Sequence, residues 1–372
     1  MALYVPEDGV PPRAVFEDLA RSVLEQYALA ERRIVAQIAR RLERDLTAEG
    51  PLARLQAQLE GVQYVEAQAR AALAKIDHDL AGQAMTAAEE AGAASAVARL
   101  GLAVALPTRG PITTGRTRAL SLLQLDLSNR LEDASQRILR SAADAYQQLA
   151  ADTVSPVLLG TQGKLEAQRA GIARFLGDGL PAFVDEGGRQ WSTGAYVEMV
   201  TRTATQRAYT ESAVTRMQDA GINLVTIVVG VGSCRMCAQW IGRVLSTDGT
   251  TGPVIVQHAT NGADITVDVT GTLAGARAAG WGHPNCRCHV AAYLPGLPIP
   301  AAATTYDPVL EAAHARQREL ERRLRRDKLR LSVNADDTTK ARIRATQDEL
   351  RQHIATHDLP RKRNREQPAF SG

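Results

Sequence analysis

The stretch INLVTIVVG at residues 222–230 decides the fold class, because the spacing of apolar residues changes there. It is short and rich in β-branched side chains, which is typical of a buried strand. Further segments of this kind follow, separated by turns that contain glycine or asparagine. The pattern predicts a compact strand-rich module over residues 222–297. Its further predicted elements are strands RVLSTD (243–248), VIVQHA (254–259), ITVDVT (265–270) and CRCHVAAYLP (286–295), and a short helix LAGARAAG (273–280).

The sequence before this module has the apolar period of helices, with breaks at Gly50-Pro51 and at residues 107–115. Its alanine-rich part predicts close packing against a neighbouring helix, and Gly221 is placed to cap the last helix. We interpret this part as two helical regions, residues 1–106 and 116–221, whose apolar stripes serve helix packing. The predicted helices span 13–49, 52–100, 116–158, 164–183 and 193–220.

The sequence after the module, residues 305–372, predicts a basic helical tail. Helical patterning runs from Pro308 to about His357, and the end PRKRNREQPAFSG (360–372) is expected to be disordered on its own. Residues 307–372 hold sixteen basic and eleven acidic groups, whereas the whole chain has a net charge of +3. Such a tail can bind an acidic or anionic partner, or it can be a solvated helix of mixed charge. Because aromatic residues for base stacking are lacking nearby, any contact with nucleic acid would be electrostatic and independent of sequence.

Composition and patterning together predict an α+β fold, with a mainly helical N-terminal region, a small strand-rich module with a cysteine clasp, and a helical basic C-terminal tail. Aromatic residues make up 4% of the chain, which suits helices with narrow apolar seams. No apolar run reaches the roughly 18 residues needed to span a bilayer. The start MALYVPEDGVPPRAVFEDLA lacks the pattern of a secretory signal. The chain is therefore expected in a reducing cytosol, where close-set cysteines favour metal binding over disulfides.

All four cysteines fall into two close pairs at the ends of the strand-rich module. The first, Cys-x-x-Cys, is a tight turn that can offer two thiolates to one tetrahedral ion. The second, Cys-x-Cys, is expected on a strand, where alternation puts both side chains on the same face. A structural zinc ion is the favoured interpretation, and disulfides, free thiols or a catalytic role are the alternatives. The predicted zinc ligands are Cys234, Cys237, Cys286 and Cys288, with His283 and His289 as alternative ligands.

Motifs for catalysis match this sequence poorly. A zinc deaminase needs a glutamate two residues after a histidine ligand, and none follows His258, His283 or His289 at that spacing. A cysteine nucleophile would need a base and an orienting group, for which Cys286, His283 and Asn285 are the candidates. No glycine loop of the phosphate-binding type is present. The chain is expected not to be an enzyme, and a Cys/His-dependent enzyme is the weaker alternative.

The cysteine motifs resemble those of phage minor head proteins, namely the Mu F head-morphogenesis family and the related minor capsid protein 2 family. Members typically show a Cys-x-x-Cys pair, a Gly–Lys/Arg–Val–Phe/Leu turn and a closing His-Pro-Asn-Cys-Arg-Cys motif. The sequence matches them at Cys234/Cys237, at GRVL (242–245) and at HPNCRC (283–288). The preceding helix resembles the family's helix with an Arg-Thr pair, here Arg202-Thr203. The resemblance covers residues 190–297.

The resemblance implies a structural virion protein, a minor capsid and portal-associated protein that acts in head assembly without enzymatic activity of its own. It implies portal and capsid proteins as partners and several copies in each virion. It also implies assembly in the host cytoplasm and a final place at the portal vertex or in the capsid interior. Residues 307–372 are the candidate for non-specific contact with packaged DNA. A zinc-binding module that contacts nucleic acid outside a virus is the alternative.

Overall fold

The computed structural model describes a mainly helical α+β protein with a small five-stranded mixed sheet, as the sequence predicts. The chain divides into two compact units. The first comprises Met1–Val23, Asp79–Asn129 and Glu198–Glu311, and the rest of the chain forms the second. The described residues are 12–45, 51–77, 79–100, 114–158, 183–184, 190–191, 193–228, 234–284, 286, 288–299, 306–333 and 337–367.

The long helices follow the breaks that the sequence predicts. Helix α2 begins at Pro51, because proline fits the first helical position, where its missing N–H removes no hydrogen bond. A turn interrupts the helical pattern of 52–100 and separates α2 from α3, and in this turn the Asp77 amide donates to Gln26 Oε1 at 2.7 Å. The helix predicted over 164–183 lies outside the described residues except for Phe183, which begins a short hairpin of β1 (Phe183–Val184) and β2 (Gln190–Trp191). The long helices are α1 (Pro12–Asp45), α2 (Pro51–Leu73), α3 (Leu80–Leu100), α4 (Thr114–Leu158), α6 (Thr193–Asp219), α9 (Pro308–Val333) and α10 (Asp337–Thr356).

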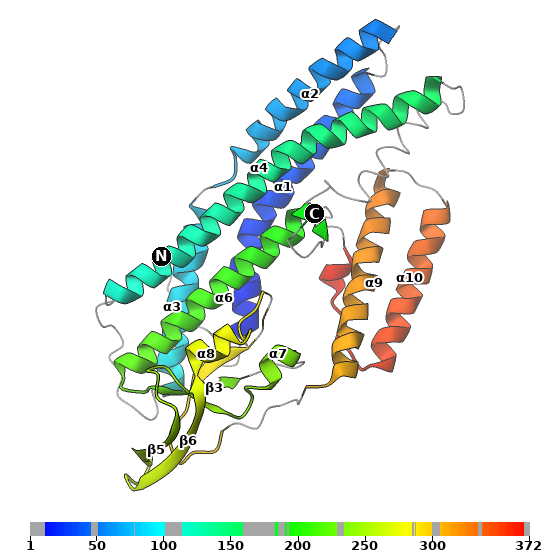
Figure 1. Cartoon of the computed structure of the whole chain (residues 1–372). Helices are drawn as coiled ribbons and strands as arrows, with labels where there is room; N and C mark the ends of the chain where they lie inside the picture. Colours follow the sequence, from blue (N-terminus) through cyan, green and yellow to red (C-terminus); the bar gives the residue numbers. More distant parts are fainter. Residues whose placement is uncertain are drawn as a thin grey trace. The chain divides into compact units, whose positions relative to one another are not determined.

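The first unit is built on the five-stranded sheet, of which Figure 1 labels β3, β5 and β6. The strand order of this sheet is β5-β6-β4-β3-β7. Strands β4 and β6 are parallel, and the other neighbours are antiparallel. The predicted strands and the short helix are confirmed, but the last strand begins at His289, three residues later than predicted. The elements are β3 (Leu224–Val228), α7 (Arg235–Ala238), β4 (Val244–Ser246), β5 (Gly252–Gln257), β6 (Asp264–Thr272), α8 (Leu273–Ala278) and β7 (His289–Ala292).

Alternation along the strands gives the sheet two apolar faces. On β3, Val225 and Ile227 belong to one core cluster, while Leu224 packs into another around Val267 and Val269 of β6. The first cluster also contains residues of helices α3, α6 and α8 and three of the cysteines, and the partly buried Cys234 packs against it. The cysteines therefore belong to the hydrophobic core on the helix-covered face of the sheet. The helical members of this cluster are Ala96, Ala213, Val214, Met217, Leu273 and Ala276.

Helix α6 ends at the glycine cap that the sequence predicts. Gly221 has a φ of 75°, a left-handed conformation that glycine adopts without strain. The Ile222 amide donates to the Met217 carbonyl and the Gly221 amide to the Gln218 carbonyl, both at 2.8 Å. These two bonds satisfy carbonyls at the helix end. Because Met217 and Ile222 also pack in the same apolar cluster, the cap directs the chain from α6 into β3.

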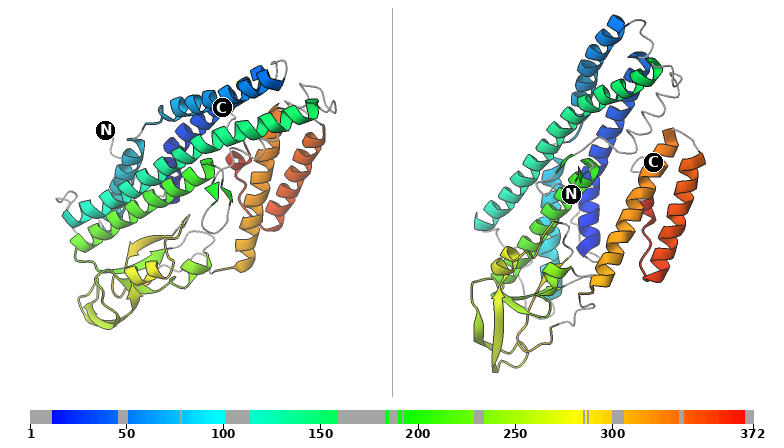
Figure 2. Two further views of the ribbon diagram at one scale, coloured as in Figure 1. Left: turned by 45° about the horizontal axis from the view of Figure 1, so that its top comes forward. Right: turned by 45° about the vertical axis from the view of Figure 1, so that its right-hand side comes forward.

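In the second unit, α1 and the later part of α4 lie side by side (Figures 1 and 2). The Tyr27 hydroxyl donates to the Leu131 carbonyl at 2.9 Å, and the Tyr146 hydroxyl donates to the carboxylate of Asp45. The same carboxylate accepts from Arg41 at 2.9 Å. Asp45 is buried, and its two partners compensate for the loss of water around its charge.

Helices α9 and α10 of the second unit lie side by side and run in opposite directions (Figures 1 and 2). The apolar core between them contains Leu320, Leu324, Ile343 and Leu350. Surface ion pairs join the two helices, among them Arg316 with Glu349. The predicted helical tail is therefore a helical hairpin with a small core of its own.

The chain after α10 folds back onto α9. Gln317 donates to the Pro360 carbonyl at 3.0 Å, and Arg325 donates to the Arg365 carbonyl at 2.9 Å. The expectation of a disordered terminus is wrong for residues 360–367, because side chains of α9 bind their backbone carbonyls. Residues 368–372 lie outside the described residues.

Candidate metal centre

The two cysteine pairs meet because β3 and β7 are antiparallel neighbours. Val228, the last residue of β3, is paired with His289, the first residue of β7. The first cysteine pair follows β3 and the second precedes β7, so both pairs come to the same end of two adjacent strands. The register of this strand pair therefore brings together residues about fifty positions apart in the sequence.

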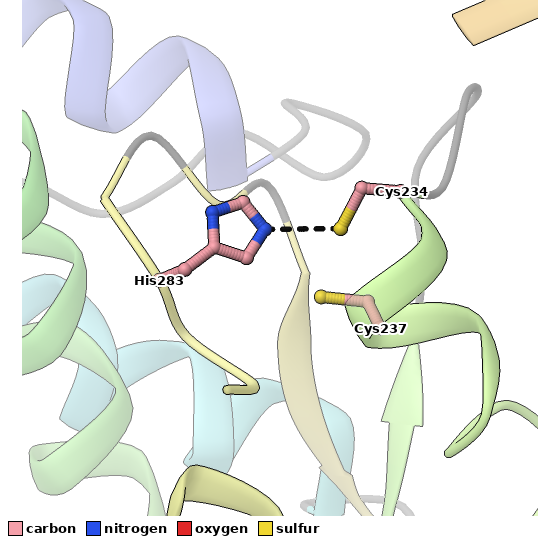
Figure 3. A group of neighbouring side chains, drawn as sticks. All are labelled: Cys234, Cys237 and His283. Atoms are coloured by element: carbon pink, nitrogen blue, oxygen red, sulfur yellow. Dashed lines mark hydrogen bonds between the residues drawn. The ribbon is translucent and has the colours of Figure 1, made fainter. Parts of the chain in front are cut away.

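Cys234 and Cys237 share the turn that begins helix α7. Cys234 stands just before the helix in an extended conformation (φ −84°, ψ 163°). Its carbonyl accepts from the Cys237 amide at 3.1 Å and from the Ala238 amide at 3.0 Å. Residues three apart on such a turn project to the same side. Both sulfur atoms consequently point toward the imidazole of His283 (Figure 3).

The second group of donors lies between α8 and β7. Gly280 and Gly282 have φ values of 93° and 74°, which turn the chain after α8 and favour glycine at both positions. A hydrogen bond of 2.9 Å from the Cys286 amide to the His283 carbonyl closes a second turn. Cys286 and Cys288 therefore precede β7, and the prediction that strand alternation aligns them is wrong, because the chain is not yet extended in a strand there.

The sulfur and imidazole donors form two overlapping groups. Within each group the donor atoms lie within 4.8 Å of one another, and Cys237 belongs to both groups. Cys234 Sγ is 3.0 Å from His283 Nε2, and Cys237 Sγ is 3.5 Å from Cys286 Sγ (Figure 3 shows the first contact). Since Cys237 is 0% exposed, it is the buried centre of the cluster. The two groups are Cys234, Cys237 and His283, and Cys237, Cys286 and Cys288.

The close approach of four free thiols perturbs their ionisation. The hydrogen bond with Cys237 lowers the pKa of Cys234 to about 4, and the bond with His283 lowers it as well. The hydrogen bond with Cys234 raises the pKa of His283 to about 9. Hydrogen bonds with Cys234 and Cys286 raise the pKa of Cys237. Thiols this close together oppose one another's ionisation, and all can ionise together only if a cation offsets their mutual repulsion.

This set of donors fits a zinc ion. Zinc prefers thiolate sulfur at about 2.3 Å and imidazole nitrogen at about 2.0 Å in tetrahedral geometry, so that two ligands lie roughly 3.5–3.8 Å apart. The Cys234–His283 and Cys237–Cys286 distances of 3.0 and 3.5 Å come close to that separation before any ion is bound. Burial of Cys237, Cys286 and Cys288 favours a closed site made of protein ligands only.

The other candidate residues lie differently from the sequence expectations. His289 is on β7, and among the described residues it belongs to neither donor group. The Nε2 atom of His283 is bonded to Cys234, so it is not aligned as a base for Cys286. Cys286 is 3% exposed, whereas a nucleophile needs access to its substrate. Asn285, the orienting group of that hypothesis, lies outside the described residues.

Helix α6 contacts the site through Gln206, which the sequence analysis missed. Gln206 is 5% exposed, and its Nε2 donates to the Cys288 carbonyl at 2.8 Å. The sequence indicates it only weakly, because Gln206 is one of two glutamines on α6 and belongs to no motif. The Arg202-Thr203 pair has partners within α6, Arg202 with Glu198 and Thr203 with the Met199 carbonyl. Gln206 is therefore the side chain that joins this helix to the cysteine-bearing segment.

A comparison with known protein families identifies the family of this chain. The sequence model described as phage minor capsid protein 2 matches residues 12–355. The chain belongs to this family. The match extends over the helical regions on both sides of the sheet, beyond the residues 190–297 whose motifs resemble the family. Neither the curated proteins nor the solved structures that were searched contain a match.

Membership of the minor capsid family assigns the chain a structural role in the virion, in contact with other virion proteins. None of the helices in the described part of the chain has an apolar stretch long enough to cross a membrane. The cysteine cluster of this family member lies in the core of the sheet-containing unit.

Proposed function

We propose that this minor capsid protein acts in head assembly at the portal vertex or in the capsid interior, in several copies, and has no enzymatic activity. The family match over residues 12–355 carries this proposal. Burial of Cys237, Cys286 and Cys288 in the core supports a structural use of the cysteine cluster. We also propose that a zinc ion stabilises the sheet-containing unit. This ion would be bound by a cysteine clasp formed by donors among Cys234, Cys237, His283, Cys286 and Cys288.

Co-purification with the portal protein tests the proposed location. The chain is produced together with the portal protein and the major capsid protein of the same phage, and each of the two is used in turn to capture it. We expect the chain to be captured by the portal protein at a fixed ratio and to be present in assembled heads. Heads of normal composition and infectivity that form without the chain would contradict a role in assembly.

The α9–α10 hairpin supports a second contact, with packaged DNA. Several of its basic residues are ion-paired, for example Arg316 with Glu319 and Lys340 with Asp337. Arginines on the exposed side of α9 form no ion pair within the described residues, and DNA phosphates would supply the missing negative charge. Such contacts are independent of sequence, as the lack of nearby aromatic residues predicts. Within the described part of residues 308–367, the exposed arginines without an ion pair are Arg322, Arg323 and Arg326 on α9, Arg344 on α10 and Arg363 after α10.

Substitution of three of these arginines tests the DNA contact. The variant Arg322→Gln/Arg323→Gln/Arg326→Gln is expected to lose most of its salt-dependent retention on duplex DNA. The slope of log K against log salt should fall by up to about 3, since each phosphate contact contributes about 0.9. The matched control, Arg316→Gln/Lys340→Gln/Arg351→Gln, removes the same charge from residues that are already ion-paired.

Two outcomes would contradict the DNA contact. One is equal retention of the full chain and of a chain truncated after residue 306. The other is an equal loss in the two triple variants, which would mean that only net charge matters. If DNA retention is unchanged but binding to an acidic head protein is lost, the arginine face serves that protein.

A further inference from the structure

The site offers five donor side chains, whereas a tetrahedral zinc ion takes four. The two cysteine pairs are the obvious set of four ligands. The backbone turns, however, pair Cys234 with Cys237 and His283 with Cys286. Two turns of the same form hold them, each closed by a hydrogen bond from the fourth residue to the first. The Cys237 amide donates to the Cys234 carbonyl at 3.1 Å, and the Cys286 amide donates to the His283 carbonyl at 2.9 Å. His-x-x-Cys therefore repeats the ligand spacing of Cys-x-x-Cys.

The imidazole of His283 is oriented as a ligand. Its Nδ1 lies 2.8 Å from the Pro284 carbonyl, and because a carbonyl can only accept, Nδ1 carries the proton of this bond. Nε2 then points at Cys234 Sγ, 3.0 Å away, and can offer its lone pair to a cation (Figure 3). Metal-bound histidines almost always donate their second ring N–H to a carbonyl, a carboxylate or water. The carbonyl of Pro284 is such a partner.

Cys288 is held by different contacts. Its carbonyl accepts from Gln206 of α6 at 2.8 Å, and the next residue begins β7. Cys286 and Cys288 both share a donor group with Cys237, and neither shares one with Cys234 or His283. The turn that is closed by the hydrogen bond to the His283 carbonyl ends at Cys286, two residues before Cys288. The Cys288 side chain belongs to the same apolar cluster as those of Cys237 and Cys286. Helix and strand thus anchor Cys288 as part of the core.

The net charge of the occupied site favours a ligand set that includes His283 over a set of four thiolates. Zinc with four thiolates carries a net charge of −2, and zinc with three thiolates and a neutral imidazole carries −1. Since Cys237, Cys286 and Cys288 are all buried, the second set buries less charge away from water.

We propose that zinc is bound by Cys234, Cys237, His283 and Cys286, with Cys288 outside the coordination shell. The inference rests on the zinc clasp proposed above and specifies its ligands. Two turns with the same spacing, one following β3 and one preceding β7, then close over one ion and tie the two strand ends together.

X-ray absorption at the zinc edge tests the ligand set on the unaltered full-length protein, purified under reducing conditions. The expected first shell contains three sulfur atoms and one nitrogen atom. Four sulfur atoms would overturn the ligand set while leaving the zinc clasp in place. Absence of bound zinc would overturn the clasp and the ligand set together.

Substitutions provide an independent measurement, with cobalt as the spectroscopic probe and zinc affinity measured by competition with a chelating dye. Cys288→Ser is the matched control for Cys286→Ser. We expect Cys288→Ser to keep one equivalent of metal and the full thiolate-to-cobalt absorption. In Cys286→Ser this absorption should fall by about a third, because one of the three thiolate ligands is gone. His283→Ala should weaken zinc binding by at least about 100-fold, and His283→Cys should restore it. Loss of metal in Cys288→Ser with retention in His283→Ala would overturn the proposal.

Discussion

Removal of zinc by a chelator, in the presence of a reductant, is expected to destabilise the sheet-containing unit by about 4 kcal/mol or more. A ligand that binds only the folded state and is present at roughly 1,000 times its dissociation constant contributes about that much. The thiols lie in the same apolar cluster as Trp281 and Trp240, two of the three tryptophans of the chain. Thermal unfolding followed by tryptophan fluorescence therefore reports on this unit, and its midpoint should fall when the chelator is added.

The control for chelation is Cys237→Ser. Because Cys237 belongs to both donor groups, this variant should unfold at the low temperature of the chelated protein whether or not zinc is added. In the unaltered chain, excess zinc added after chelation should restore the original unfolding midpoint, which would show that loss of zinc caused the decrease. Unfolding curves that coincide with and without chelator would show that no structural metal is bound.

Gly92→Ala is expected to lower the free energy of unfolding of the first unit by about 2 kcal/mol. Gly92 lies on α3, and a Cβ atom there would overlap the backbone carbonyl of Tyr209 on α6. The backbone of a helix cannot yield as a flexible side chain does, so the helices must separate. Overpacking of this kind costs roughly 1–3 kcal/mol, partly offset by the better helix propensity of alanine. Chemical denaturation monitored by circular dichroism measures the change.

Gly82→Ala is the matched control on the same helix. A Cβ atom at Gly82 would meet the side-chain amide of Gln124 at 2.8 Å, and that side chain can move aside. We expect this variant to be unchanged or to gain up to about 1 kcal/mol from helix propensity. Equal effects of the two substitutions would mean that the close approach of α3 and α6 at Tyr209 is not a constraint.

Local patterns predicted the elements of this chain well. The β-branched run at 222–230 contains β3, and the run at 265–270 lies within β6, because strand and helix periods depend on neighbours in the sequence. Gly221 ended α6 as expected, since only its own backbone had to turn. The turn between α2 and α3 was less visible, because the residues on both sides of it have the same helical period.

Contacts between distant segments were harder to predict. The terminal residues 360–367 look like a disordered basic end, but Gln317 and Arg325 of α9 bind their carbonyls. The contact of Gln206 with the site was hard to predict, because its hydrogen-bond partner, the Cys288 carbonyl, is 82 residues away in the sequence. The predicted strand alternation of Cys286 and Cys288 was wrong, since the turn at His283 delays the start of β7.

By itself, the sequence determined that helices surround a small strand-rich module, that its four cysteines form two pairs, and that their motifs resemble those of phage minor head proteins. Only the tertiary structure decided which donors face one another, namely His283 with Cys234 and Cys237 with Cys286. The physical reason is that period, turn chemistry and ligand spacing are local properties of the chain. The approach of the two turns depends instead on the antiparallel register of β3 and β7, which packing of the whole unit sets.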